Sequence, residues 1–220
     1  MNDPATEGAL PPLDAVEARI LAALVEKEST TPEAYPLTAN AVQLACNQKT
    51  NREPVLELEA GEVGHALRQL EQRGLVRSVH GARAQRYEHR FAQAYSITLK
   101  QQALLCVLML RGPQTAAELL ARGERLQAPD DLDDARQTLE RLQQRGLALR
   151  LARQPGQRED RYVQLLCGPV DEATLPAVAA APRAPTRSDE ALDRRVAELE
   201  ARIARLEAAL GLPADDAAAD

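Results

Sequence analysis

The side chains best suited to recognition chemistry are gathered in one polar run, Ala45–Val55, which reads ACNQKTNREPV. Asn and Gln pair well with the edge of adenine, and Lys and Arg bind phosphate groups. A run that combines both kinds of side chain therefore predicts a contact with nucleic acid. The residues predicted to make it are Asn47, Gln48, Lys49, Asn51 and Arg52.

A purely structural role for this run is the alternative. In that case Asn47 would end the preceding helix in the left-handed conformation, and residues 50–51 would form a side-chain turn. Arg52 would then pair with a nearby carboxylate, Glu53 or Glu57. Both interpretations place the run in an irregular connection, because Pro54 interrupts any regular element there.

The elements that must hold this run form a pattern of three helices and two strands that occurs twice. The first copy is predicted to have helices at 13–28, 39–46 and 60–73 and strands at 75–80 and 86–91. The second is predicted to have helices at 99–111, 116–122 and 132–145 and strands at 147–152 and 161–167. Thr38 and Thr115 are expected to cap the second helices, and Gly74 and Gly146 to end the third ones.

The repeat is visible in the letters, since LRQLEQRGL at 67–75 matches LERLQQRGL at 139–147. Three helices followed by a hairpin are typical of a winged helix, a helix-turn-helix with a β wing. The predicted fold class is therefore mainly α with short β-hairpins (α+β), built from tandem winged-helix (helix-turn-helix) domains. The polar run falls between the second and third helices of the first copy, where that copy is five residues longer than the second.

Arginines gather on both predicted wings. Arginine on a wing contacts the DNA backbone, which supplies affinity without sequence choice. Solvated arginines with no partner are the alternative, because both third helices begin with carboxylates, Glu57, Glu59 and Glu62 in the first copy. The wing residues predicted to bind nucleic acid are Arg77, Arg83, Arg86, Arg150, Arg153 and Arg158.

Composition excludes several other classes of protein. None of the common motifs for nucleotide binding, zinc proteolysis or serine hydrolysis occurs, so we expect no enzyme activity, no cofactor and no metal. Two wing histidines, His80 and His89, are expected to be cross-strand neighbours at most. The three isolated cysteines are expected to be buried and reduced. No signal peptide or membrane span is seen, which predicts a cytoplasmic protein without a membrane partner.

A heptad pattern marks the C-terminal part of the chain. Leu and β-branched residues alternate at spacings of three and four there, which favours a two-stranded parallel coiled coil and hence a homodimer. An amphipathic helix that docks on its own body is the alternative. The predicted dimer contacts are Leu192, Val196, Leu199, Ile203 and Leu206.

Domain boundaries follow from these patterns. Residues 171–220 hold six basic against eleven acidic residues and therefore supply most of the net charge of −6. The predicted divisions are a disordered N-terminus at 1–12, winged-helix domains at 13–95 and 96–168, an Ala/Pro linker at 169–188, a coiled-coil helix at 189–210 and a disordered tail at 211–220.

The string ACNQKTNREPV, with Thr30-Thr31-Pro32-Glu33 and Tyr35-Pro36-Leu37 before it and Arg161-Tyr162 after it, resembles the YceH-like family of uncharacterised bacterial proteins. The resemblance covers about residues 13–167 and implies tandem winged-helix domains, but no activity or catalytic residue. We therefore predict a DNA-binding or regulatory protein whose partner is double-stranded DNA. The alternative is a protein–protein assembly or adaptor module that uses the same surfaces without binding DNA.

Overall fold

The computed structural model describes residues 10–80, 84–153 and 159–170. The chain divides into two compact units, Met1–Leu175 and Pro176–Asp220. The second unit lies outside the described residues, and so do the predicted coiled-coil helix, the dimer contacts and the predicted linker from residue 171 on. Two of the predicted binding residues, Arg83 and Arg158, also fall outside them.

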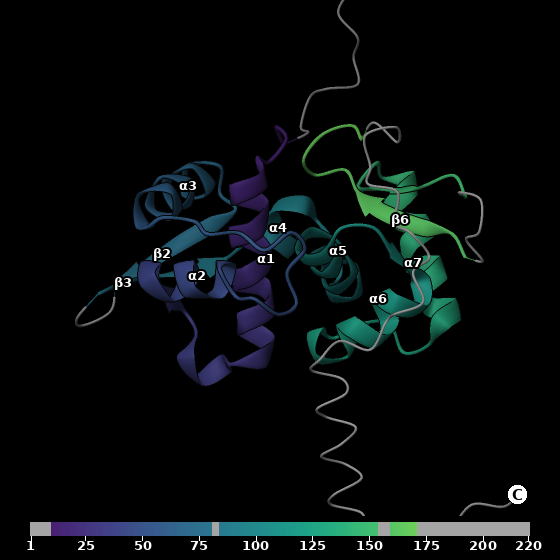
Figure 1. Cartoon of the computed structure of the whole chain (residues 1–220), viewed down its shortest axis with the longest axis horizontal. Coiled ribbons are helices and arrows are strands. Elements are labelled where there is room, and N and C mark those ends of the chain that lie inside the picture. The colour runs from purple at the N-terminus through teal and green to yellow at the C-terminus, as the bar shows by residue number, and fades with distance from the viewer. Residues whose placement is uncertain (1–9, 81–83, 154–158, 171–220) are drawn as a thin grey trace, which may run out of the picture. The chain divides into compact units, whose positions relative to one another are not determined.

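The first copy begins with a long helix, α1, which continues two residues beyond the predicted end at residue 28. A 3-10 turn, η1, and a two-residue strand, β1, follow it, and the sequence had predicted neither (Figure 1). The elements are α1 (Ala15–Thr30), η1 (Pro32–Ala34), β1 (Leu37–Thr38), α2 (Ala39–Cys46), α3 (Ala60–Gln72), β2 (Val76–His80) and β3 (Gln85–His89).

The second copy repeats this order after a short additional helix, α4 (Phe91–Tyr95). Its long helix α5 has the bounds predicted from sequence, and the 3-10 turn η2 lies between its second and third helices. The elements are α5 (Leu99–Arg111), β4 (Gln114–Thr115), α6 (Ala116–Gly123), η2 (Glu124–Leu126), α7 (Leu132–Gln144), β5 (Ala148–Arg150) and β6 (Arg161–Gln164).

Side-chain caps set the helix starts. Asp14 accepts from the Glu17 amide and Glu17 accepts from the Asp14 amide, so a complete capping box starts α1 at Ala15, two residues later than the periodicity suggested. The predicted caps are confirmed: Thr38 accepts from the Ala41 amide, and Thr115 from the Glu118 amide.

Each predicted hairpin is part of a three-stranded antiparallel sheet, in the order β1-β3-β2 or β4-β6-β5. The extra strand comes from the connection between the first two helices, with Leu37 opposite Tyr87 and Gln114 opposite Tyr162. Two residues are too few for an alternating pattern, which is why the sequence did not reveal β1 or β4.

The prediction of a strand over residues 86–91 was wrong at the C-terminal boundary. The structure ends β3 at His89, and Phe91 opens α4 instead. The Phe91 side chain is fully buried and packs edge-on against Tyr95, with ring centroids 5.3 Å apart. Aromatic residues are common in strands, so the sequence favoured extending the strand to Phe91. In the structure Phe91 instead belongs to a helix, because its side chain is buried in the core shared by both copies.

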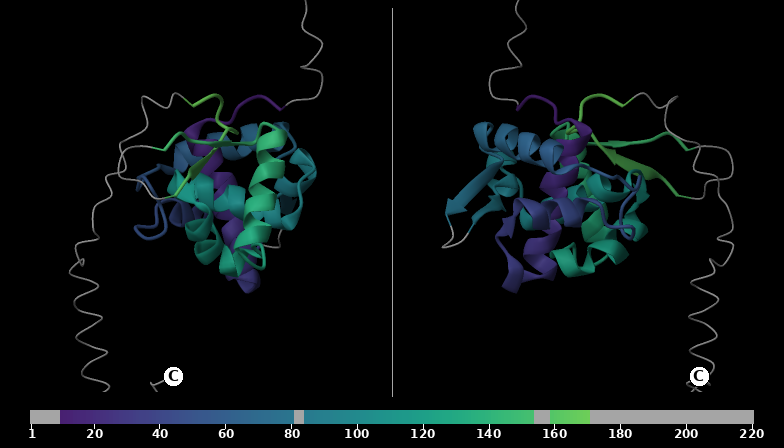
Figure 2. Two further views of the ribbon diagram at one scale, coloured as in Figure 1. Left: turned by 90° about the vertical axis from the view of Figure 1, so that its right-hand side faces the viewer. Right: turned by 60° about the vertical axis from the view of Figure 1, so that its left-hand side comes forward.

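The core is centred on α1 and α5, which pack against each other (Figure 1). Residues Glu17–Val25 of α1 and Gln101–Leu110 of α5 are all buried, so neither helix keeps the solvent face expected of an amphipathic helix. Figure 2 shows the sheets of the two copies on opposite sides of this helix pair. One continuous apolar cluster therefore serves both copies.

No helix among residues 10–80, 84–153 and 159–170 is both long enough and apolar enough to cross a bilayer.

Candidate functional site

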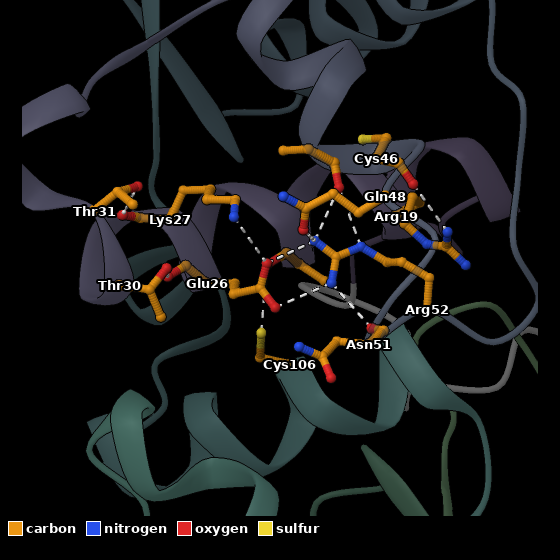
Figure 3. Close-up of polar contacts among 12 residues, drawn as sticks. Arg19, Glu26, Lys27, Thr30, Thr31, Cys46, Gln48, Asn51, Arg52 and Cys106 are labelled. Atoms are coloured by element: carbon orange, nitrogen blue, oxygen red, sulfur yellow. Dashed lines mark hydrogen bonds and ion pairs between the residues drawn. The ribbon is translucent and has the colours of Figure 1, made fainter. Parts of the chain in front are cut away.

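Arg52 is the centre of the polar run, and its side chain has no exposed surface. Its guanidinium makes a bidentate contact with the Glu26 carboxylate of α1, with Nη1 donating to Oε1 at 3.0 Å and Nη2 to Oε2 at 2.6 Å (Figure 3). It also donates to the carbonyl of Ala45, to the carbonyl of Asn51 and to the side chain of Gln48. All its donor positions are thus directed to internal acceptors.

This placement corrects two sequence predictions about Arg52. A phosphate cannot reach the guanidinium, so Arg52 does not contribute to a DNA-binding surface in this structure. Its carboxylate partner is Glu26 rather than Glu53 or Glu57, because the run folds back across the end of α2 onto α1.

Asn47 fastens the run to the segment before α3. Its side chain donates to the Leu58 carbonyl and accepts from the Leu58 amide, each at 2.9 Å. The predicted left-handed conformation was assigned to the wrong residue: Asn47 ends α2 with a φ of −90°, whereas Asn51 has a φ of 60°. Both Asn47 and Asn51 are thus occupied within the fold, and the structural interpretation accounts for their side chains.

The run also reaches the second copy. The Glu53 amide donates to the Leu110 carbonyl at 2.7 Å, and Arg111 of α5 donates to the side chain of Asn51. A buried arginine of α1, Arg19, donates to the Pro54 carbonyl at 2.7 Å. Burial lowers the pKa of Arg19, and the neighbouring Arg52 lowers it further. The run therefore joins α1, α2 and α5, which places it where the two copies meet.

Lys49 is the one candidate of the run that is exposed and makes no polar side-chain contact among the described residues. Gln48 accepts from Arg52 at 3.2 Å. The five side chains that the sequence grouped as a recognition surface are thus divided, with four serving the fold and Lys49 facing solvent.

The arginines of the predicted wings that lie among the described residues have internal partners. Arg77 lies 2.7 Å from Glu88, and Arg150 and Arg153 share Asp160 at 3.6 and 2.7 Å. Arg86 donates to two main-chain carbonyls, those of Ala34 and Pro36, and so connects β3 to the segment before β1. Ion pairs of this exposed kind reduce the charge available to a phosphate.

The exposed face of α3 carries side chains that were not among the binding residues predicted from the sequence. Val63, Ala66, Leu67 and Leu70 face the core, and the opposite side carries His65, Arg68, Gln69 and Gln72. None of these four side chains makes a hydrogen bond or ion pair within the described residues. The signal that could have found them is the helical period itself, since a buried stripe defines the opposite, exposed one.

The matching face of α7 is different in charge. At the offset of 72 residues, Arg68 corresponds to Glu140 and Gly64 to Arg136. Arg136 is paired with Asp133 at 3.1 Å, so part of this face is neutralised internally. Asp131 accepts from the Asp134 amide and so caps α7.

The remaining predicted groups also have defined places. His80 pairs with Gln85, and His89 with Val76, so the two histidines are not cross-strand neighbours, contrary to expectation. Cys46 and Cys106 are buried as predicted, and burial raises the pKa of the Cys46 thiol to about 12. Cys167 is exposed, which corrects the third cysteine prediction, because it lies just beyond the end of β6.

Comparison with known proteins shows where this arrangement belongs. A family model described as "protein of unknown function, DUF480" matches residues 13–157, which is more than half of the chain. A UPF0502 protein of Stenotrophomonas maltophilia strain K279a is 53% identical over 212 residues, covering 96% of this chain and 98% of its own. The chain belongs to the DUF480/UPF0502 family. The UPF0502 protein of Xanthomonas campestris pv. campestris strain B100 is 56% identical over 203 residues and 91% of each chain.

The match to the UPF0502 family agrees with the resemblance seen in the sequence, at the level of an uncharacterised bacterial family. The DUF480 model runs from before α1 to beyond β5, so it includes the polar run and the third helices of both copies.

Proposed function

We propose that each copy is a winged helix and that the protein is a cytoplasmic DNA-binding regulator. The assignment is supported by the element order, in which a strand after the first helix joins the hairpin that follows the third helix. In a helix-turn-helix domain the third helix of such a unit enters the major groove and the wing lies on the backbone. This orientation makes α3 the reading helix of the first copy.

The observation that carries the proposal is the exposed face of α3. Arg68, Gln69 and Gln72 have side chains with no polar partner among the residues that the structure describes, and these residue types form bidentate pairs with guanine and adenine. Gly61 and Gly64 come before them, and a Cβ added at Gly61 would meet no atom within 4 Å. Glycines near one end of α3 and polar side chains along the rest allow the helix to approach a DNA groove closely.

The carboxylates at the start of α3 limit where a DNA duplex can lie along this helix. The Glu62 side chain accepts from the Glu59 amide at 2.8 Å, so it serves the helix start, where negative charge complements the helix dipole. These charges repel phosphates at that end. We therefore place the DNA contacts on the middle and the C-terminal half of α3, from His65 to Gln72.

The test is binding to a random-sequence DNA duplex, followed by fluorescence anisotropy across a salt series. Arg68→Ala is expected to weaken binding about tenfold and to lower the salt dependence by about one counterion. Arg141→Ala is the matched control, because Arg141 lies on the corresponding face of α7 beside Glu140, and it is expected to bind like the unaltered chain. Unchanged affinity in Arg68→Ala, or no binding at low salt, contradicts the proposal.

A protein-docking function is the second candidate, and one observation favours it. Leu44 on α2 and Val55 in the polar run are 65% and 49% exposed, although large apolar side chains of this kind are usually covered. The test is cross-linking to a defined protein partner after nuclease treatment. Loss of that partner in Leu44→Lys, with retention in Leu99→Lys, supports docking, since Leu99 in the second copy is also an exposed leucine, at 52%.

The proposed oligomer is a homodimer formed through Leu192, Val196, Leu199, Ile203 and Leu206, which lie outside the described residues. Light scattering of the full chain tests this proposal, with Leu199→Asp as the variant. A dimeric mass that falls to that of the monomer in Leu199→Asp supports the proposal. A monomeric mass in the unaltered chain contradicts it.

A further inference from the structure

A cavity of about 310 Å³ lies where the two copies meet. Its walls come from α1, the polar run, α5, α6 and η2. This volume falls at the lower end of the range of about 300–1,000 Å³ typical of small-molecule sites. The residues that line it are Glu26, Thr30, Asn51, Val107, Leu110, Arg111, Ala121, Arg122, Glu124, Arg125 and Leu126.

The lining is unevenly charged. It contains three guanidinium groups, those of Arg111, Arg122 and Arg125, and two carboxylates. One of the carboxylates, Glu26, is already neutralised by the bidentate contact with Arg52. Glu124 is therefore the one lining carboxylate among the described residues that is not held by Arg52.

The two arginines near η2 are the most available of these cations. Arg125 is exposed and makes no polar side-chain contact among the described residues. Arg122 lies 3.6 Å from Glu118, but Glu118 is also 3.1 Å from Arg161 and accepts from the Thr115 amide. One carboxylate divided between two guanidinium groups leaves positive charge at the cavity wall.

We propose that this cavity binds a small organic anion whose carboxylate or phosphate group lies between Arg122 and Arg125. Paired guanidinium groups match the oxygen geometry of both groups, and a single ammonium would not. The apolar part of the ligand would rest on Val107, Leu110 and Leu126, which form the apolar part of the lining. A polar ligand edge would meet Thr30 and Asn51.

Binding there would also act on the contact between the copies. Thr30 and Asn51 belong to the first copy, and the arginines belong to the second, so an anion bound between them stabilises their association. Asn51 already holds the left-handed conformation and accepts from Arg111. The cavity is thus connected to the polar run that leads to α3.

The experiment is isothermal calorimetry on the full chain with two probes, citrate for carboxylates and adenosine 5′-monophosphate for phosphate esters. At least one of the two probes is expected to bind. In a separate thermal unfolding experiment, that probe is expected to raise the unfolding midpoint more than sodium chloride of equal ionic strength does. Arg122→Ala and Arg125→Gln are each expected to weaken binding about tenfold, the loss of one charge-assisted contact. Arg125 is exposed, so its variant is expected to fold, which circular dichroism checks.

Arg141→Ala is the control, since Arg141 is an exposed arginine of α7 outside the cavity, and it is expected to leave probe binding unchanged. Three results would overturn the proposal: no binding of either probe, binding that survives in the Arg122→Ala/Arg125→Gln double variant, or an equal loss in Arg141→Ala. Because the cavity and α3 use different arginines, failure here leaves the DNA-binding test independent.

Discussion

Removing the Arg52 side chain is the sharpest test of how this fold is held together. In Arg52→Ala, the Glu26 carboxylate keeps its position on α1 and loses both guanidinium contacts. Its side chain is only 13% exposed, so water compensates little, and the next cation, Lys27, is 3.7 Å away. The carbonyls of Ala45 and Asn51 lose their side-chain donor in the same step.

The expected cost follows from this burial. Breaking a buried ion pair by removing one partner costs about 3–5 kcal/mol, because an uncompensated charge is left inside the protein. The exposed pair between Arg77 and Glu88 is the comparison, since the Arg77 side chain is 56% exposed. Exposed pairs contribute about 0–1 kcal/mol. Arg52→Ala is therefore expected to lower the free energy of unfolding by several times as much as Arg77→Ala.

The assay is urea unfolding of the full chain, followed by far-ultraviolet circular dichroism. Arg52→Lys retains a charge but not the planar fork, so its midpoint is expected to lie between those of the unaltered chain and Arg52→Ala. The double variant Arg52→Met/Glu26→Leu is expected to recover part of the loss, because it removes both charges. A loss in Arg52→Ala that is no larger than the loss in Arg77→Ala would refute the reasoning.

Three further expectations concern other parts of the chain. Burial lowers the pKa of His89 below its ordinary value of 6.5, while Glu28 at 2.8 Å and Glu88 oppose the shift. The unfolded chain then binds the proton first, so the free energy of unfolding should fall as the pH drops below about 6.5, and His89→Gln should flatten this dependence in urea titrations. Of the three thiols, Cys167 should react with a thiol reagent in the native state, and Cys46 and Cys106 only after denaturation; equal rates for all three would contradict the assigned burial. Gly74→Ala should cost about 1 kcal/mol in thermal unfolding, since its φ is +70° and the added Cβ would meet no atom; a stabilised variant would show this reasoning to be wrong.

The regular elements were largely predictable from the sequence. The helix α5 has its predicted bounds, and α2 begins at its threonine cap as expected, because apolar period and capping are properties of neighbouring residues. The strands β1 and β4 were missed because two residues carry no periodic signal. Phe91 was assigned to the wrong element because its helix forms around a core shared by both copies.

The candidate site was only partly predictable. The repeat located the polar run between the second and third helices, and the structure agrees with that position. The sequence could not distinguish an arginine that binds a partner from an arginine that stabilises the fold, since Arg52 and Arg68 are the same residue type in similarly polar surroundings. Their exposure separates them: Arg52 is 4% exposed and belongs to the fold, and Arg68 is on the open face of α3.

By itself, the sequence determined two copies of one helical unit and a polar run that only the first copy carries. Tertiary structure decided what the run does, because the partner of Arg52 is Glu26, which lies 26 residues away, and the partner of the Glu53 amide is Leu110 in the second copy. Period and capping act within a few residues and can be read from the chain, whereas a buried charge selects its partner only after α1, α2 and α5 have packed together.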